Sequence, residues 1–115
     1  MSEIKNVIHA LKILVYDLVA GDFEELRKTG RMGRLSEEEV KTALLDYGGS
    51  LSLPPDSAYE SAGFRMRKLQ NYPEYSIAFE LWIDGEQSDL SLTAIATVND
   101  IGEVLKIEMD DVHVL

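Results

Sequence analysis

Two stretches in the second half of the chain alternate apolar and polar residues with the two-residue period of a β-strand. They span residues 75–83 and 90–98, and the polar stretch 84–87 between them is long enough only for a turn. Strands joined by so short a connection must run antiparallel. Residues 64–69 and 104–109 carry two further strand patterns. The sequence therefore predicts an antiparallel meander of about four strands.

The first twenty residues carry the pattern of an amphipathic helix. Eight apolar residues recur at the three- and four-residue spacings that place them on one helical stripe. They are Ile4, Val7, Ile8, Leu11, Leu14, Val15, Leu18 and Val19. The pattern predicts a long helix that ends near Gly21 and buries this stripe.

Two shorter helices are expected between the long helix and the sheet. Asp22 precedes a short helical pattern that ends before Gly30, and Ser36 with Glu39 has the spacing of a capping box. A pair of glycines stops the second of these patterns. The residues predicted to form its inner, core-facing side are Val40, Ala43, Leu44 and Tyr47.

These patterns predict an α+β fold with N-terminal helices on one face of the sheet, because that arrangement buries both apolar surfaces at once. At 115 residues, 45% hydrophobic and 28% charged, the chain is expected to form one domain, residues 1–115. No apolar run reaches the roughly 18 residues of a membrane span, and the N-terminus lacks the pattern of an export signal. Together with the lack of cysteine, these features predict a cytoplasmic protein without a membrane contact.

Negative charge is concentrated where the sheet is predicted. Residues 74–115 contain ten acidic residues and one basic residue, Lys106, so they contribute −9 of the net charge of −10. A sheet with one apolar face and one strongly negative face favours a positively charged partner and repels nucleic acid. We therefore expect a basic protein as the partner, and no nucleic acid.

Trp82 is the candidate anchor of such an interface. Alternation places it with Glu80 on the outer face of its strand, and Asp84 and Glu86 follow in the next turn. An exposed tryptophan framed by polar groups is typical of interface hot spots. These four residues form the predicted protein-binding site. The alternative is that sheet curvature or a loop covers Trp82. The sheet also permits a homodimer.

A second candidate site is the basic loop of residues 27–34. Arg27, Arg31 and Arg34 could bind an anion, such as a phosphate, together with the main-chain N–H groups around two intervening glycines. The loop lacks the glycine and lysine spacing of a P-loop, and no strand precedes it. The alternative is a solvated connector between two helices.

No pattern indicates a metal, a cofactor or a nucleophile. His9 and His113 lie far apart in the sequence, and no cysteine is present to complete a zinc or iron site. Acid–base chemistry is suggested only by tyrosine–carboxylate neighbours such as Tyr47 with Asp46. We therefore predict no metal and no cofactor, and assign no catalytic residue.

Residues 19–26, Val-Ala-Gly-Asp-Phe-Glu-Glu-Leu, resemble the first helical hairpin of the cystatin-like, nuclear transport factor 2-like superfamily. That resemblance implies a curved sheet wrapped around a helix, with a conical pocket. Residues 81–82, 88–92 and 110–115 resemble a small bacterial domain family of unknown function. This second resemblance covers most of the chain and implies no activity or site.

Two function hypotheses remain open. The first is a non-enzymatic, acidic protein-interaction module, for instance an immunity-type inhibitor of a basic toxin. The alternative is a pocket domain of the nuclear transport factor 2-like kind, which binds or isomerises a small apolar ligand. A closed apolar cavity containing a tyrosine and a carboxylate would favour the alternative.

Overall fold

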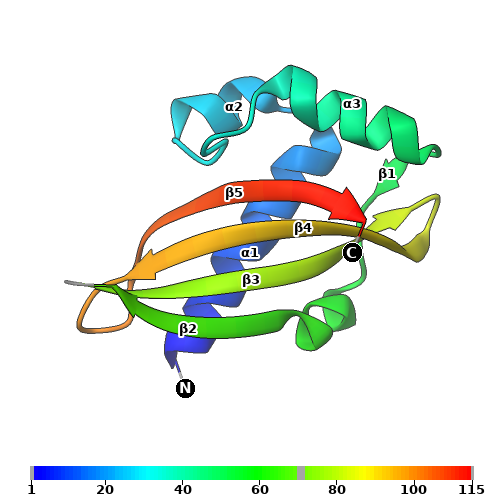
Figure 1. The fold of residues 1–115 in the computed structure, drawn as a ribbon. Helices are drawn as coiled ribbons and strands as arrows, with labels where there is room; N and C mark the ends of the chain where they lie inside the picture. The colour runs from blue at the N-terminus through cyan, green and yellow to red at the C-terminus, as the bar shows by residue number, and fades with distance from the viewer. Residues whose placement is uncertain (1, 70–71, 115) are drawn as a thin grey trace.

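A computed structural model describes residues 2–69 and 72–114 and has the predicted α+β architecture, with helices before an antiparallel sheet (Figure 1). Its elements are α1 (Ser2–Ala20), α2 (Phe23–Lys28), α3 (Glu37–Tyr47), β1 (Leu51–Ser52), the 3-10 helix η1 (Asp56–Ser61), β2 (Gly63–Leu69), β3 (Tyr72–Ile83), β4 (Glu86–Val98) and β5 (Val104–Val114). Helix α1 crosses one face of the sheet, and α2 and α3 lie beyond β5. In Figure 1 the face toward the viewer carries no α-helix.

The sheet runs in the order β1-β3-β4-β5, and β2 also pairs with β3; every pairing is antiparallel. Because β4 occupies one edge of β3, the strands β1 and β2 share the other edge. The two-residue β1 pairs with Trp82 and Ile83, whereas β2 pairs with residues 72–78. The connection through η1 therefore spans the short gap that these two strands leave along β3.

Strand β3 begins three residues earlier than the alternating pattern of residues 75–83 predicts. Residues 72–74 belong to β3 and pair with β2, while residue 71 lies outside the described part of the chain. Proline lacks an N–H for a ladder hydrogen bond. Pro73 lies beyond the pair of Glu74 with Thr97, where the register between β3 and β4 ends. The ladder with β4 therefore loses no bond to this residue.

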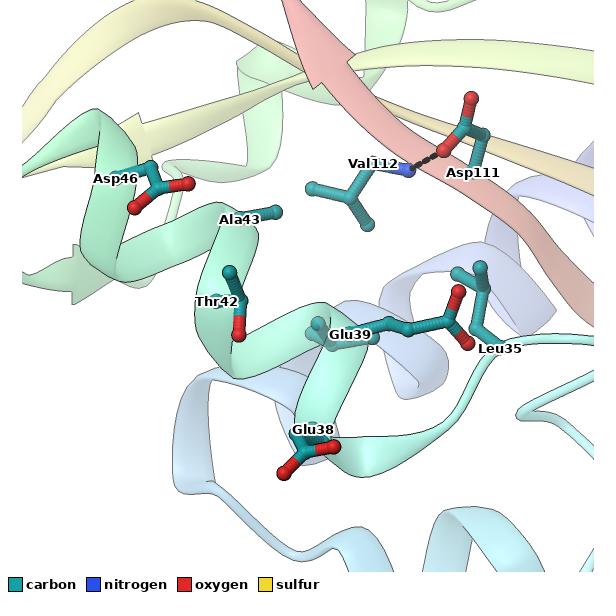
Figure 2. Close-up of a pocket in the computed structure, with 9 residues that line it drawn as sticks. Leu35, Glu38, Glu39, Thr42, Ala43, Asp46, Asp111 and Val112 are labelled. Atoms are coloured by element: carbon teal, nitrogen blue, oxygen red, sulfur yellow. Dashed lines mark hydrogen bonds between the residues drawn. The ribbon is translucent and has the colours of Figure 1, made fainter.

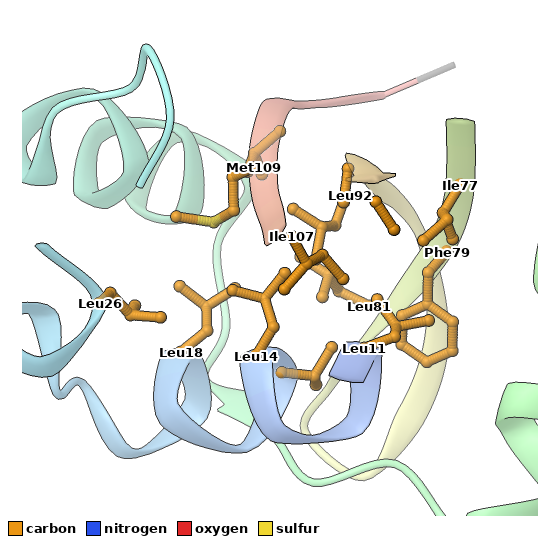
Figure 3. Packing of buried hydrophobic residues seen from close by; sticks show 14 of the residues in the cluster. Leu11, Leu14, Leu18, Leu26, Ile77, Phe79, Leu81, Leu92, Ile107 and Met109 are labelled. Atoms are coloured by element: carbon orange, nitrogen blue, oxygen red, sulfur yellow. The ribbon is translucent and has the colours of Figure 1, made fainter. Parts of the chain in front are cut away.

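The core lies between α1 and the inner face of the sheet (Figure 3). Five members of the predicted helical stripe are fully buried, and the other three are partly buried against the same cluster. Leu11 and Leu14 face Leu81 of β3 and Ile107 of β5 in Figure 3. Burial of each large aliphatic side chain contributes at most about 1.5–3 kcal/mol, before the loss of chain entropy is subtracted.

Helix α3 begins as its sequence predicts but packs differently toward its end. Ser36 and Glu39 form a complete capping box, and Val40 is buried. Tyr47, which we expected in the core, is 37% exposed, and its hydroxyl donates a hydrogen bond to Asp89 Oδ1 at 2.7 Å. The helix lies beyond β5 rather than across the sheet (Figure 1), so the core face is buried mainly near Val40.

Candidate functional site

A groove between α3 and β5, which we call the α3–β5 groove, has a volume of about 460 Å³ (Figure 2). Its floor is aliphatic: Val112 projects from β5 toward Ala43 of α3, and Leu35 and Val40 complete the apolar lining. Four carboxylates and a hydroxyl form the rest of the lining. They belong to Glu38, Glu39, Asp46, Asp111 and Thr42. None of these nine described residues carries a positive charge.

Local sequence positions α3 beside the groove. The Ser36 hydroxyl accepts a hydrogen bond from the Glu39 main-chain N–H at 3.1 Å, and Glu39 Oε1 accepts one from the Ser36 N–H at 2.9 Å. These two bonds satisfy N–H groups that would otherwise lack partners at the helix start. The cap also holds the Glu39 carboxylate beside the start of the helix.

The β5 wall of the groove is held by the loop that precedes α3. The Met109 N–H donates to the carbonyl oxygen of Arg31 at 2.8 Å, so the loop pairs with the edge of the sheet. Asp110 is the extra residue of a β-bulge, because Thr93 pairs with Asp111 while the next residue of β4 pairs with Met109. Arg34 Nε donates to the Asp110 carbonyl oxygen at 3.1 Å. The bulge lies immediately before the groove residues Asp111 and Val112.

The groove carboxylates differ in how they are held. Asp111 Oδ1 accepts the Val112 N–H at 2.9 Å (Figure 2), and Asp111 Oδ2 lies 3.2 Å from His113 Nδ1. Within the described ranges, neither Glu38 nor Asp46 makes a hydrogen bond or an ion pair through its carboxylate. Their negative charges are therefore available to a cation from outside the chain.

The four residues of the predicted protein-binding site fall into two places. Glu80 and Trp82 line a cavity of about 190 Å³ together with Gln87 and Ser91. Alanines of the η1 segment form another part of the same lining, so Trp82 is half-buried, and its indole Nε1 is buried without a hydrogen-bond partner among the described residues. The partial burial of Trp82 beside the η1 segment is in line with the alternative expected from the sequence, in which a loop covers this residue.

Asp84 and Glu86 lie apart from that cavity, at the turn between β3 and β4. Asp84 has a positive φ of 52°, and its Oδ1 accepts the Ser50 N–H at 2.9 Å. Glu86 is exposed at the first position of β4. Asp84 therefore stabilises the turn, while Glu86 presents its charge to solvent.

The three arginines of the predicted anion site are each paired with a carboxylate of the chain. Arg27 Nη1 lies 2.6 Å from Glu37, Arg31 Nη2 lies 2.6 Å from Asp17, and Arg34 Nε lies 3.4 Å from Asp110. Arg31 is only 8% exposed, whereas Arg27 and Arg34 are exposed, so the solvated connector stays the alternative for most of the loop. Anion binding here stays a prediction, and an anion would have to compete with these carboxylates.

Three described groups that do not line the α3–β5 groove have shifted pKa values. A hydrogen bond to Glu3 raises the pKa of Tyr75 to about 12, and burial with a nearby Asp56 charge raises the pKa of Tyr59 to about 12. Hydrogen bonds from Lys41 and then from Arg27 lower the pKa of Glu37. Tyr75 and Glu3 thus form a tyrosine–carboxylate pair between β3 and α1, but neither residue lines the groove.

Sequence reasoning missed the groove because its parts come from segments distant in the chain. Glu38 and Asp46 belong to α3, whereas Asp111 and Val112 belong to β5. The available signal was the run of three acidic residues in the first turn of α3, of which the sequence pattern assigned a role only to Glu39, in the capping box. The proximity of these acidic residues to Asp111 could not be inferred without the tertiary structure.

The described residues meet neither the requirements of a metal site nor those of a membrane-spanning helix. Over residues 2–69 and 72–114, no group of three or more histidine and acidic side chains is arranged to hold a metal ion. None of the described helices combines the length and the apolar character needed to cross a membrane.

Comparison with known proteins gives one match. No curated protein and no solved structure matches the chain. A family model described as "Domain of unknown function (DUF7668)" matches residues 15–115. This confirms the resemblance to a small family of unknown function, while the relation to the cystatin-like, nuclear transport factor 2-like superfamily stays a prediction. Because the matched residues make up most of its length, the chain belongs to the DUF7668 family.

Proposed function

We propose that this domain is a non-enzymatic binding module for a basic protein, and that the partner contacts the α3–β5 groove. One observation carries the proposal: four carboxylates surround an aliphatic floor that has no positive charge in its described lining. Neighbouring carboxylates repel one another, and a cationic partner removes that repulsion while it covers apolar surface. The groove therefore suits a protein surface that is both basic and partly apolar.

The charge of the whole chain acts in the same direction. A net charge of −10 on 115 residues accelerates encounter with a basic protein and repels the phosphates of nucleic acid. An immunity-type inhibitor of a basic toxin is one kind of module with this requirement, since it must bind its target tightly and needs no chemistry of its own. We propose that kind of partner.

The alternative, a pocket domain for a small apolar ligand, has one observation in its favour. Tyr75 and Glu3 form the type of tyrosine–carboxylate pair that such a domain would use. However, the region between α1 and the sheet is filled by side chains such as Leu11, Leu14 and Leu81, which are fully buried against one another (Figure 3). The open, acidic groove fits the binding module better.

The proposal is tested by capture of partners from native cells on the immobilised full chain, followed by identification and purification of each captured protein. We expect a basic protein whose affinity falls as salt is raised, because salt screens the charges. The variant Glu38→Lys should weaken its binding by about tenfold, which corresponds to about 1.4 kcal/mol. Relief of toxicity on co-expression would identify the partner as a toxin.

Glu24→Lys is the matched control for Glu38→Lys. Each glutamate is exposed, is the second residue of its helix and lies in an acidic first turn, but Glu24 belongs to α2, away from the groove. The control should leave the affinity unchanged within about twofold. Equal weakening by both variants would mean that only net charge matters. A verified partner that is neutral or acidic would contradict the proposed function.

A further inference from the structure

The floor of the α3–β5 groove selects an aliphatic side chain. Val40 and Val112 are buried at its base, and Ala43 and Leu35 are half-buried above them. All four are aliphatic, and Val112 points across the groove toward Ala43 (Figure 2). A leucine, isoleucine or valine placed there would bury its surface against apolar atoms on both sides.

Glu38 and Asp46 mark the two ends of the groove along α3. They are eight residues apart, so at 1.5 Å per residue their positions are separated by about 12 Å along the helix axis. Both carboxylates lack a charged partner within the described structure. The two carboxylates that lie with them, on Glu39 and Asp111, each accept a main-chain N–H instead.

An extended segment matches this spacing. In a β-strand, residues i, i+2 and i+4 point to the same side, and residues i and i+4 are about 13 Å apart. A helix places residues i and i+4 only about 6 Å apart and reaches about 12 Å only with residues i and i+8, so the four-residue spacing reaches both ends of the groove only in an extended chain. An extended segment with two cations four residues apart can therefore place one cation at Glu38 and the other at Asp46. An aliphatic residue midway between the cations then lies on the floor of the groove.

The other flank of α3 offers a further contact. Leu45 is 81% exposed and lies in a second shallow groove, which shares Glu38 and Thr42 with the first. Helix α3 thus forms a ridge between two grooves, with a large apolar side chain on its outer flank. A protein bound along the α3–β5 groove can cover Leu45 with its neighbouring surface, as an isolated small cation cannot.

A second copy of this chain does not suit the groove. Two chains of net charge −10 repel one another, and Arg27, Arg31 and Arg34 are already paired with internal carboxylates. Nucleic acid is excluded by the same sign of charge.

We propose that the α3–β5 groove binds an extended basic segment of the partner protein with the pattern cation–x–aliphatic–x–cation, where the cations are lysine or arginine. The aliphatic side chain packs on Ala43 and Val112, and the two cations reach Glu38 and Asp46. This inference rests on the proposed function, because it specifies the part of the basic partner that enters the groove.

Two capped peptides of identical composition test the pattern. Lys-Ser-Leu-Ser-Lys has the proposed spacing, and Leu-Ser-Lys-Lys-Ser has the same charge and the same residues in another order. Each is titrated into the isotopically labelled full chain at low ionic strength, and amide chemical shifts are followed by NMR. We expect the first peptide to bind about three- to fivefold more tightly, with the largest shifts at residues 38–46 and 111–113.

Paired variants locate the effect. Glu38→Gln with Asp46→Asn should abolish the difference between the peptides. Glu24→Gln with Asp100→Asn removes the same charge from exposed positions outside the groove and should preserve the difference. Equal affinity for the two peptides, or shifts spread over all acidic surfaces, would overturn the inference and leave a non-specific acidic cluster.

The outcomes also separate this inference from the proposed function. If a basic partner is identified but its affinity is unaffected by Glu38→Gln with Asp46→Asn, the inference fails and the function stands. If the peptide preference is found but the verified partner is not basic, the proposed function fails and the chemistry of the groove stands.

Discussion

Arg31 and Asp17 form an ion pair in which Arg31 Nη2 donates to Asp17 Oδ2 at 2.6 Å; Arg31 is buried and Asp17 is partly buried. Arg31 Nε also donates to the Thr29 hydroxyl at 2.7 Å, while Nη1 is buried without a partner among the described residues. The pair joins the loop before α3 to the last turns of α1. It therefore links the position of α3, and with it the α3–β5 groove, to the central helix.

Removal of one member of this pair should be strongly destabilising. We expect Asp17→Ala to lower the free energy of unfolding by about 3–5 kcal/mol, because it leaves the Arg31 charge buried and unpaired. Urea denaturation of the variant and wild type measures the difference. The double variant Asp17→Leu with Arg31→Met should recover much of the loss, since an apolar pair of similar volume removes the unpaired charge. No recovery would show that the loss comes from packing.

Leu11→Ala should lower the free energy of unfolding by about 2–5 kcal/mol, the cost of a cavity in a closed core. Leu11 is fully buried at the centre of the α1 stripe. Ile13 lies on the outer side of the same helix and is 45% exposed, so Ile13→Ala should lower the free energy of unfolding much less. Similar denaturation midpoints for the two variants would contradict the placement of the core.

Gly33 makes the closest approach between the loop and β5. Its φ is +60°, and a Cβ there would lie 2.2 Å from the Met109 carbonyl oxygen. Gly33→Ala should therefore displace the loop from β5 and cost about 1–3 kcal/mol. Gly30 has a similar positive φ of +74° but open space around it. Gly30→Ala should therefore cost less stability and leave the Met109 amide protected from hydrogen exchange. Retained protection of Met109 in the Gly33 variant would rule out this close approach.

Stability should decline in alkaline solution through Tyr75. Its pKa is raised from 10.0 to about 12, first by the hydrogen bond to Glu3, so the folded state holds the phenolic proton more tightly than the unfolded state. The stabilisation is complete below pH 10 and is lost as the pH rises from about 10 through 12. Tyr75→Phe should show a smaller loss of stability across that range in denaturant titrations. An unchanged pH profile would exclude Tyr75 as a source.

The Trp82 side chain lines a cavity together with alanines of the η1 segment. Its indole N–H is buried without a partner among the described residues. Trp82→Ala should be destabilising, but by less than the roughly 3–5 kcal/mol of a fully buried tryptophan, because the residue is half-buried. Trp82→Phe keeps most of the ring and removes the N–H, so it should be close to neutral. A large loss in the phenylalanine variant would mean that the N–H has a bonding role.

Local pattern alone determined the helices, most strand positions and the caps of this protein. The Ser36–Glu39 capping box, the Leu11 stripe and the short turn after Ile83 each depend on residues within a few positions of one another. Their hydrogen bonds and periodicities are therefore readable in one dimension. The same applies to the sign of the surface charge, which follows from composition.

Only the tertiary structure decided which distant groups meet. Arg31 could not be paired with Asp17 from sequence, and the loop could not be placed on Met109 of β5. Tyr47 satisfied the helical period of a core residue, yet α3 lies beyond β5, where the Tyr47 side chain at the end of the helix contacts Asp89 and solvent. The α3–β5 groove arises for the same reason, because its helix and its strand are joined only by long-range packing, whose geometry depends on the whole core rather than on either segment.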